Sequence, residues 1–332
     1  MSNFQSLTMD ELCLALCENK KTLIIYHVRS DADAIGSAFA LRELLRLMDI
    51  PAICACADEI PDRLRFLTDG VQGSVVLDEE MELDHERVIS VDSASPAQLG
   101  ELFGRLHRYV DLMIDHHGSG TVYADYYIDA EASATGEIIY EIAKTLVRMG
   151  KIGAIPPRVI NGVYAAICSD TGCFRFQNAT PRTFRCVAEL LEAGAEQGEI
   201  NRRLFESKTF KQVKAEGEAA NRLTLYDGGR IAAVTFPYSS KFALSLSDEN
   251  LETIIDVPRS IGGVEVAFTV RQPEDKPFFR VSMRSASEVD VSAICARFGG
   301  GGHIRAAGCS LEAANVREAE EILLKAVRQA ME

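Results

Sequence analysis

LIIYHVRSDADAIGS, residues 23–37, joins a short apolar run to a polar turn and then to the start of a helical pattern. Residues 23–26 are typical of a buried strand, and residues 35–48 repeat apolar side chains at helical spacing. In open α/β sheets, ligands bind at the carboxyl ends of the strands, which is where this polar turn lies. A helix that begins at such a turn also favours an anionic ligand. The stretch therefore predicts an α/β fold and the edge of the sheet at which its site lies.

The same alternation of strand and helix patterns continues through the N-terminal part of the chain. Further strands are expected at 50–57, 88–91 and 112–114, and helices at 135–149, 157–168 and 181–192. The last helix has a strong start, because Thr180 can cap it and Pro181 suits its first position. The alternation predicts a mostly parallel sheet with helices on both faces.

The pattern changes after the DGG turn at 227–229. Strands rich in β-branched and aromatic residues are expected at 230–236, 264–271 and 278–284, and helices near 291–297 and 313–331. A chain of 332 residues is also longer than one typical domain. We therefore expect an N-terminal α/β domain over 1–195, a helical connection over 196–226 and a smaller C-terminal α+β domain over 227–332.

Composition and charge weigh against several classes of protein. The net charge of −14 disfavours a large basic surface for duplex DNA, whose binding draws on many phosphate contacts. No apolar run is long enough to cross a bilayer, and the first residues lack the basic and apolar regions of a secretory signal. The nine cysteines include no Cys-x-x-Cys pair, which is typical of free thiols in a reducing compartment. We therefore expect a cytoplasmic protein without a membrane or duplex DNA as partner.

Acidic and imidazole side chains follow four of the expected elements, each at the point where the element ends. They are His27, Asp31 and Asp33 after the first strand, Asp92 after the third, Asp115, His116 and His117 after the fourth, and Asp170 at the end of a helix. Taken singly, an Asp on a turn is more often a helix cap than a ligand. Capping alone does not explain the recurrence at successive elements, so we expect these side chains to converge.

Convergence of so many carboxylates requires a counter-charge. Two carboxylates about 4 Å apart repel by about 4 kcal/mol at an effective dielectric constant of about 20. Two divalent cations would offset that charge, and without them some carboxylates would be protonated. Mixed Asp and His ligation suits Mn²⁺ and, less selectively, other first-row ions, whereas an all-oxygen set favours Mg²⁺ or Ca²⁺. We therefore expect two Mn²⁺ ions, with Mg²⁺ or Co²⁺ as substitutes.

A second candidate site lies near the C-terminus, at the glycine-rich run FGGGGH, residues 298–303. Such a run lets the backbone approach a ligand closely, with the amides of Gly300, Gly301 and Gly302 free to donate to an anion. His303 can contact phosphate, and Arg284, at the end of a strand, offers a bidentate fork. The alternative is a flexible linker, but the alanine-rich segment that follows is expected to be helical. We therefore expect these five residues to bind substrate.

This ordered set of motifs resembles the DHH phosphoesterase superfamily, and the run at 298–303, with AAG at 306–308, resembles its DHH-associated C-terminal domain. Together the two resemblances span nearly the whole chain, and the compact layout is most similar to that of bacterial nanoRNase/pAp phosphatase proteins. One departure is visible. Ser30 stands where proline is frequent in the family, which affects the stiffness of the loop rather than its ligands.

The resemblance implies a role for each of the site residues. The first metal ion would be held by His27, Asp31 and Asp92, with Asp92 bridging to the second ion. The second ion would be held by Asp33, Asp92, His116 and Asp170. Asp115 would orient a histidine, and His117 would contact the substrate phosphate. The active site would lie in a cleft between the two domains.

The resemblance further implies a Mn²⁺-dependent hydrolase of phosphoester bonds. Short oligoribonucleotides (nanoRNA) and 3′-phosphoadenosine 5′-phosphate (pAp) are the first candidate substrates, and linear or cyclic dinucleotides such as pApA and cyclic di-AMP are the alternative. Hydrolysis of pyrophosphate or polyphosphate is a further enzymatic alternative. From a different class, a nucleotide-binding regulatory protein with an inactive metal site is less favoured, because the ligand set is complete. A homodimer is left open.

Overall fold

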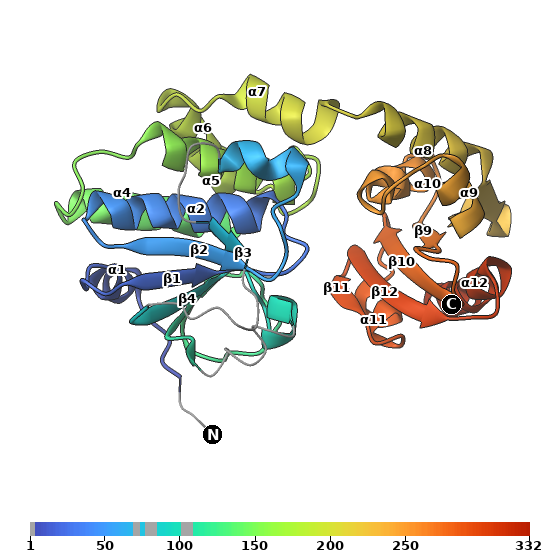
Figure 1. Ribbon diagram of the computed structural model, residues 1–332, viewed down its shortest axis with the longest axis horizontal. Coiled ribbons are helices and arrows are strands. Elements are labelled where there is room, and N and C mark those ends of the chain that lie inside the picture. Colours follow the sequence, from blue (N-terminus) through green and yellow to red (C-terminus); the bar gives the residue numbers. More distant parts are fainter. Residues whose placement is uncertain (1–3, 69–73, 77–84, 101–108) are drawn as a thin grey trace. The chain divides into compact units, whose positions relative to one another are not determined.

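The structure, a computed structural model, describes residues 4–68, 74–76, 85–100 and 109–332. The chain divides into two compact units, residues 1–207 and 208–332, whose elements are labelled in Figure 1. Each unit has its own sheet and its own apolar core. Within the described residues, no helix combines the length and the apolar character that crossing a membrane requires.

The first unit is built on a six-stranded sheet in the order β3-β2-β1-β4-β5-β6, and all of its pairings are parallel. Its strands are β1 (Thr22–Ile25), β2 (Ala52–Cys56), β3 (Ser74–Val76), β4 (Arg87–Val91), β5 (Leu112–Asp115) and β6 (Asp125–Ile128). The strand order reverses between β1 and β4, and ligands bind open sheets at such a switch point. The parallel sheet that the sequence predicts is therefore confirmed, and its switch point falls at the loops after β1 and β4.

Helices α2 and α4 lie on one face of this sheet, and α5 packs against both of them (Figure 1). The described residues of the unit form the helices α1 (Met9–Leu16), α2 (Ala32–Leu47), α4 (Thr135–Arg148), α5 (Pro157–Asp170), α6 (Pro181–Glu192) and α7 (Gln197–Asn201), with the short helices η1 (Asp62–Leu67), η2 (Pro96–Leu99) and η4 (Arg202–Glu206). The opposite face carries a smaller apolar cluster that includes Leu99 of η2 and Tyr123. The sheet is thus enclosed by apolar side chains on both faces, as a parallel sheet requires.

Helices α2 and α5 approach each other at two glycines. A Cβ atom on Gly36 would lie 2.4 Å from the carbonyl oxygen of Gly162, so a larger side chain there would force the helices apart. α2 begins directly after its cap, Asp31, and α5 ends at Asp170. The close approach of the two helices therefore supports the meeting of acidic groups from the start of α2 and the end of α5.

The second unit contains a six-stranded mixed sheet in the order β11-β12-β10-β9-β8-β7, in which β8 and β9 are parallel and the other pairs antiparallel. Its strands are β7 (Leu223–Tyr226), β8 (Ile231–Phe236), β9 (Val266–Arg271), β10 (Phe278–Ser285), β11 (Gly301–His303) and β12 (Ala306–Glu312). Its helices are α8 (Phe210–Asn221), α9 (Tyr238–Ala243), α10 (Asp256–Arg259), α11 (Val291–Ala296) and α12 (Val316–Met331), with η5 (Asp227–Gly229), η6 (Glu249–Leu251) and η7 (Thr253–Ile255). This is the smaller α+β fold that the sequence predicts.

Two segments of the second unit differ from the expectation. The alanine-rich segment after the glycine run is not helical: it forms β12, whose alternate residues Ala307, Cys309 and Leu311 enter the core. Leu223–Tyr226, at the end of the expected helical connection, forms strand β7. In both segments, pairing with a neighbouring strand outweighs a weak local preference for helix.

Candidate metal centre

The loops after β1 and β4 bring three of the predicted ligands together. The Nε2 atom of His27 lies 3.8 Å from Asp31 Oδ1 and 3.5 Å from Asp92 Oδ2. The other ring nitrogen, Nδ1, lies 2.9 Å from the carbonyl oxygen of Val28, and a hydrogen bond there turns Nε2 toward the carboxylates. Asp31 is also the N-cap of α2, where Oδ1 accepts from two amides of the first turn. A helix cap and a metal ligand are therefore compatible roles for this side chain.

A second group of donors surrounds His116, which follows β5. Its Nε2 atom lies 3.3 Å from Asp170 Oδ2, 3.7 Å from Asp92 Oδ1 and 3.8 Å from Asp33 Oδ2. The other ring nitrogen again faces a backbone carbonyl, that of Ala132, at 3.3 Å. Asp33 and Asp92 are buried, and the Asp170 side chain is 19% exposed. Water therefore screens the charges of this group poorly.

His117 stands beside these donors and is held by Asp115. Asp115 Oδ1 accepts from Nδ1 of His117 at 2.7 Å and from its backbone amide at 3.0 Å. The same Nδ1 lies 3.8 Å from Asp92 Oδ1. The carboxylate of Asp115 therefore fixes the orientation of the His117 ring and leaves its Nε2 on the side away from Asp115.

The predicted ligands form one continuous cluster. The described residues contain three groups of donors whose atoms lie within 4.8 Å of one another. The groups are His27, Asp31 and Asp92; Asp33, His116 and Asp170; and Asp92, His116 and His117. Asp92 and His116 each belong to two groups, and this sharing joins the three. Asp92 has a φ angle of +55°, a left-handed conformation that Asp and Asn adopt more readily than most residues.

Burial and mutual repulsion determine the protonation of this cluster. Burial opposes the charged form of His116, but the hydrogen bond to Asp170 and the charges of Asp33 and Asp92 outweigh it and raise the pKa of His116 to about 11. Burial, reinforced by neighbouring carboxylates, raises the pKa of Asp170 to about 6 and the pKa of Asp33 well above its usual value. In the metal-free protein, protons on the imidazoles therefore balance part of the carboxylate charge.

The donor set fits divalent metal ions. It combines carboxylate oxygens with imidazole nitrogens, and His27 and His116 each engage a backbone carbonyl through the ring nitrogen that faces away from the cluster. This second hydrogen bond is typical of metal-binding histidines, because it fixes the tautomer and the direction of the ring. Mixed nitrogen and oxygen donors suit Mn²⁺ and other first-row ions. The residues are able to hold metal, and the identity of the metal stays a prediction.

We expect the affinity for Mn²⁺ to rise with pH across the neutral range. A ligating imidazole must be neutral, and His116 keeps its proton up to a pKa of about 11 in the metal-free protein. Asp170, in contrast, loses its proton above a pKa of about 6. Between these two values each metal ion that binds displaces protons, which calorimetric titration in buffers of different ionisation enthalpy will count. An affinity that stays constant between about pH 6.5 and pH 8.5 would contradict this expectation.

Two of the predicted substrate-binding residues lie close together within the second unit. Arg284 on β10 and His303 on β11 both stand opposite Ala306 of the strand between them, β12. The half-buried guanidinium of Arg284 donates to the carbonyl oxygen of Met283, and among the described residues no carboxylate forms an ion pair with it. A partly desolvated cation without a counter-ion among the described residues is a favourable place for an anion.

Close packing of the backbone requires glycine at two positions of the run, and the sequence alone does not reveal this requirement. A Cβ atom on Gly300 would lie 2.2 Å from the carbonyl oxygen of Gly308, and one on Gly302 would lie 2.5 Å from that of Ala306. The backbones of this segment and β12 therefore approach too closely for side chains at these two positions. Gly301 has open space around it instead, with no atom within 4 Å of an added Cβ. Of the three predicted glycines, Gly301 has the most room for a ligand.

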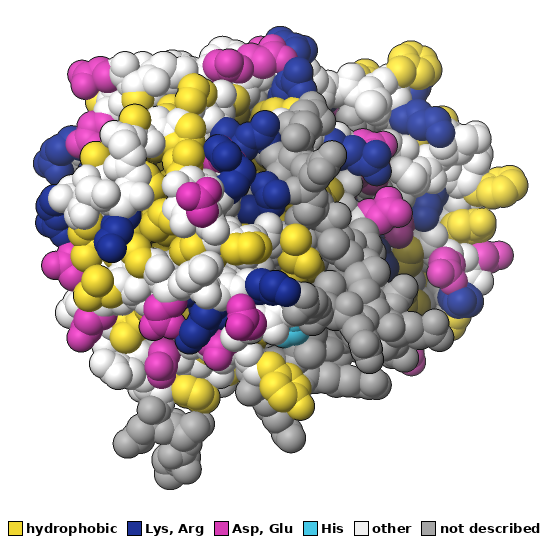
Figure 2. Space-filling model, turned by 60° about the vertical axis from the view of Figure 1, so that its left-hand side comes forward, with side chains coloured by type: hydrophobic (Ala, Val, Ile, Leu, Met, Phe, Trp, Pro, Cys, Tyr) yellow, Lys and Arg dark blue, Asp and Glu magenta, His cyan; other side chains and the backbone are white. Residues whose placement is uncertain are grey.

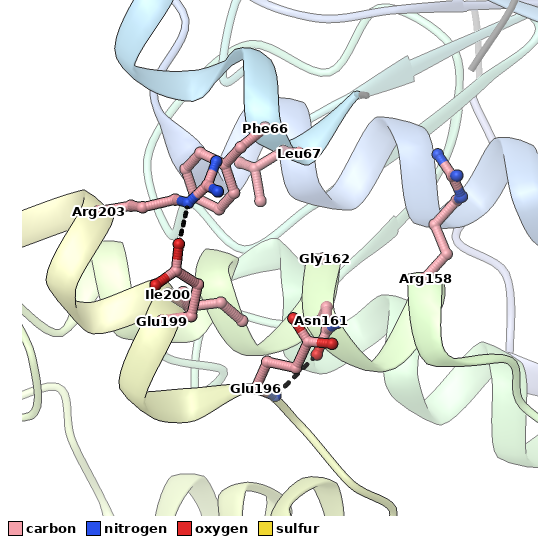
Figure 3. A pocket seen from close by; sticks show the side chains of 9 residues that line it. All are labelled: Phe66, Leu67, Arg158, Asn161, Gly162, Glu196, Glu199, Ile200 and Arg203. Atoms are coloured by element: carbon pink, nitrogen blue, oxygen red, sulfur yellow. Dashed lines mark hydrogen bonds and ion pairs between the residues drawn. The ribbon is translucent and has the colours of Figure 1, made fainter. Parts of the chain in front are cut away.

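A separate pocket of about 320 Å³ lies in the first unit, among η1, α5, α7 and η4 (Figure 3). Arg203 on its wall pairs with Glu199, and Asn161 accepts from the amide of Glu196. None of the predicted site residues lines this pocket. The pocket and the metal-binding cluster are distinct features.

Sequence reasoning misses the donors that hold the acidic side chains of the cluster in place. The backbone amides of Thr135 and Gly136 donate to Asp33, and the hydroxyl of Thr135 donates to Asp92. These residues open helix α4, whose N-cap, Ala134, has no side chain able to cap it. An alanine at the N-cap is the one local sign that a distant residue caps this helix.

The fold and the cluster define an α/β protein with a parallel sheet. At the switch point of that sheet lies a carboxylate-rich centre of the kind that binds metal ions. Residues 21–167 match the model of the DHH family, N-terminal domain, and residues 232–332 match that of the DHHA1 domain. The chain therefore carries a DHH-family N-terminal domain, followed by a DHHA1 domain as its second part. It is accordingly a hydrolase of phosphoester bonds.

Individual relatives support this assignment. The bifunctional oligoribonuclease and PAP phosphatase NrnA of Thermus thermophilus is 28% identical, over 92% of this chain and 89% of its own length. The cyclic-di-AMP phosphodiesterase PdeA of Listeria monocytogenes is 24% identical, over 94% of this chain and 48% of its own length. The crystal structure of an exopolyphosphatase-related protein from Bacteroides fragilis has a TM-score of 0.86 at 22% identity, covering 98% of this chain and 97% of that one. The last likeness shows the fold alone.

Proposed function

We propose that the protein is a Mn²⁺-dependent phosphoesterase that hydrolyses short oligoribonucleotides, pAp or both. The observation that carries this proposal is the continuous cluster of carboxylates and imidazoles in which Asp92 joins two donor groups. Relatives named as oligoribonuclease and PAP phosphatase match this chain over nearly their full length, which favours the same class of substrate.

Within the proposal, each donor group has a defined task. One ion would be held by His27, Asp31 and Asp92, and the second by Asp33, His116 and Asp170 together with Asp92, which lies 3.7 Å from His116. Two bound divalent ions supply an activated water and neutralise charge on the phosphate and its leaving oxygen. The remaining tasks belong to the chain itself: Asp92 would contact both ions, and the other carboxylates and imidazoles would supply the donors around them.

His117 is proposed to contact the phosphate that is cleaved. Burial opposes a charge on this ring, but the hydrogen bond and the charge of Asp115 outweigh it and raise the pKa of His117. A raised pKa favours the protonated ring, in which Nδ1 donates to Asp115. Nε2 then donates to a phosphate oxygen, and Asp115 acts by keeping the ring in that orientation.

The second unit is proposed to bind the part of the substrate that is not cleaved. Arg284 and His303 would hold a second phosphate across Ala306, and the exposed backbone at Gly301 would donate an amide to the same anion. Gly300 and Gly302 contribute by letting β11 approach β12. A site of this kind favours a small substrate with two phosphates, such as pAp or a short oligonucleotide.

Hydrolysis of linear or cyclic dinucleotides is the second candidate. The match to the cyclic-di-AMP phosphodiesterase of Listeria favours it, although this chain spans 48% of that protein. Its chemistry would use the same donors, because the bond cleaved is again a phosphodiester. A regulatory protein with an inactive centre is disfavoured by the intact set of donors.

We also propose that the protein acts in the cytoplasm and without duplex DNA. All nine cysteines are free thiols, which suits a reducing compartment. Figure 2 shows Lys and Arg side chains interspersed with Asp and Glu on one face, in keeping with a net charge of −14. Duplex binding draws on a concentrated basic surface instead.

A product time course on a small panel tests the proposal. The substrates are pAp, a short RNA, pApA, cyclic di-AMP and pyrophosphate, each with Mn²⁺, Mg²⁺ or Co²⁺. We expect phosphate from pAp and mononucleotides from the RNA, fastest with Mn²⁺ and not at all after chelation. Tight binding of nucleotide without any product would show a regulatory protein, and turnover of pyrophosphate alone would show a pyrophosphatase.

A further inference from the structure

The first turn of helix α4 holds two of the proposed metal ligands at once. The backbone amide of Thr135 donates to Asp33 Oδ2 at 2.7 Å, and the amide of Gly136 donates to Asp33 Oδ1 at 2.9 Å. The hydroxyl of Thr135 donates to Asp92 Oδ1 at 3.0 Å. Asp33 thus caps a helix that its own N-cap, Ala134, leaves uncapped. One residue, Thr135, therefore links two carboxylates that arise from different elements.

The residues just before this turn hold the other two members of the same donor group. The carbonyl oxygen of Ala132 faces Nδ1 of His116 at 3.3 Å. The side-chain amide of Asn178 donates to the carbonyl oxygens of both Ser133 and Asp170, at 3.1 Å each. Segment 132–136 therefore contacts Asp33, Asp92 and His116 directly and is linked to Asp170 through Asn178. These four residues are the proposed ligands of the second ion.

The backbone atoms of this segment and the side chain of Thr135 contact different ligands, so a mutation can separate their contributions. The contacts to Asp33 and His116 use backbone atoms and survive a change of side chain. The contact to Asp92 uses the Thr135 hydroxyl, which is completely buried. A carboxylate oxygen has two lone pairs, so Oδ1 can accept from Thr135 and still face the cluster. The β-branched side chain of Thr is stiff at χ1, which limits the rotation of the carboxylate that it holds.

We propose that Thr135 is a positioning residue of the metal centre, which fixes the carboxylate of Asp92 in the orientation that serves both ions. The inference rests on the proposed two-metal function, and it adds a residue that touches neither substrate nor metal. The positive end of the α4 dipole, directed at Asp33 and Asp92, reinforces the effect by stabilising both anions. The dipole does not fix the orientation of the Asp92 carboxylate, whereas the hydrogen bond from the Thr135 hydroxyl does.

Thr135→Val is the decisive variant, because it keeps the shape of the side chain and removes the hydroxyl. We expect Mn²⁺ to bind the variant about 10- to 100-fold more weakly by calorimetric titration, the usual effect of losing a partner of a metal ligand. With Mn²⁺ near saturation, kcat for pAp should fall and KM should stay unchanged, because Thr135 does not touch the substrate. Thr135→Ser keeps the hydroxyl and should restore both Mn²⁺ affinity and kcat.

Thr145→Val is the matched control. It makes the same chemical change at a buried position of the same helix, about three turns from the centre, and should leave Mn²⁺ affinity and kcat as in the wild type. If Thr135→Val does not fold by circular dichroism, Thr135→Ala replaces it, since it removes the hydroxyl without placing a methyl group against the carboxylate.

The outcomes separate this inference from the proposed function. If the folded Thr135 variant binds Mn²⁺ and turns over as the wild type does, the positioning role is wrong while the two-metal function stands. A Thr135→Ser protein as impaired as Thr135→Val would also overturn the role, because the hydroxyl would then not matter. If the wild type itself binds no Mn²⁺, it is the proposed function that fails.

Discussion

Asp92→Asn is expected to lower the rate of Mn²⁺-dependent hydrolysis by at least about 10³-fold. A bound divalent ion contributes several kcal/mol to the stabilisation of charge, and about 1.4 kcal/mol corresponds to a tenfold change in rate. Asp92 belongs to two donor groups, and Asn has one oxygen where bridging needs two. Asn also tolerates the φ angle of +55° at this position, so the fold should persist. Initial rates on pAp and short RNA, with circular dichroism as the fold control, measure the effect.

Asp111→Asn is the matched control for this variant. Asp111 lies just before the amino end of β5, at the edge of the sheet opposite the cluster, and its Oδ2 accepts from the amide of Val88. Asn keeps an oxygen for that bond, so the variant should retain the wild-type rate. Turnover by Asp92→Asn at a rate comparable with that of the control would show that the reaction does not need a bridging carboxylate.

Arg284→Ala is expected to reduce kcat/KM for pAp by about 30- to 100-fold, mainly through KM. Hydrogen bonds to charged groups contribute about 1.5–3 kcal/mol, and a guanidinium can form two of them with one phosphate. The variant should be at least as stable as the wild type, because the half-buried guanidinium forms no ion pair within the described part of the chain. Steady-state kinetics and a thermal melt measure the two effects.

Arg280→Ala tests whether any arginine of this strand would give the same result. Arg280 lies on the same face of β10, four residues earlier, and is paired with Asp248 at 3.3 Å. Its loss should leave KM for pAp unchanged. If the Arg284 variant has the KM of the wild type, Arg284 does not bind the substrate anion. Substrate binding would then belong to the first unit.

Much of the fold could be predicted because its signals are local. The runs that form β1, β4 and β5 are short, apolar and followed by polar turns, and all three are buried strands in the structure. Thr180 and Pro181 gave a correct start for α6, where the capping box and proline at the first position are both present. Such features depend on neighbours in sequence, so a single chain displays them.

The convergence of the ligands could be predicted for a related reason. Carboxyl ends of parallel strands meet at one edge, so His27, Asp92 and His116 had to approach one another once the strands were parallel and adjacent. The position of Asp170 depends instead on the close approach of α2 and α5 at Gly36 and Gly162, which is not a consequence of strand order. These side chains lie close together in the structure, and their roles as ligands stay a prediction.

What could not be predicted depends on contacts that are distant in sequence. Thr135 lies 102 residues from Asp33 and 43 from Asp92, and the alanine at the N-cap indicates a missing cap without indicating which distant residues supply the contacts. The segment that begins at Ala306 has the composition of a helix, but it pairs with a strand on each side and is therefore part of the sheet. Gly300 is required because of that same pairing, which the sequence does not display. From the sequence, this glycine was therefore interpreted as part of a ligand-binding run.

The most direct measurement of the central claim is anomalous diffraction at the manganese edge from crystals of the active protein grown with Mn²⁺. The account predicts two peaks per chain about 3.5–4 Å apart. One would lie among His27, Asp31 and Asp92, and the other among Asp33, Asp92, His116 and Asp170. Crystals of a protein that hydrolyses pAp but shows no anomalous peak at this cluster would contradict it.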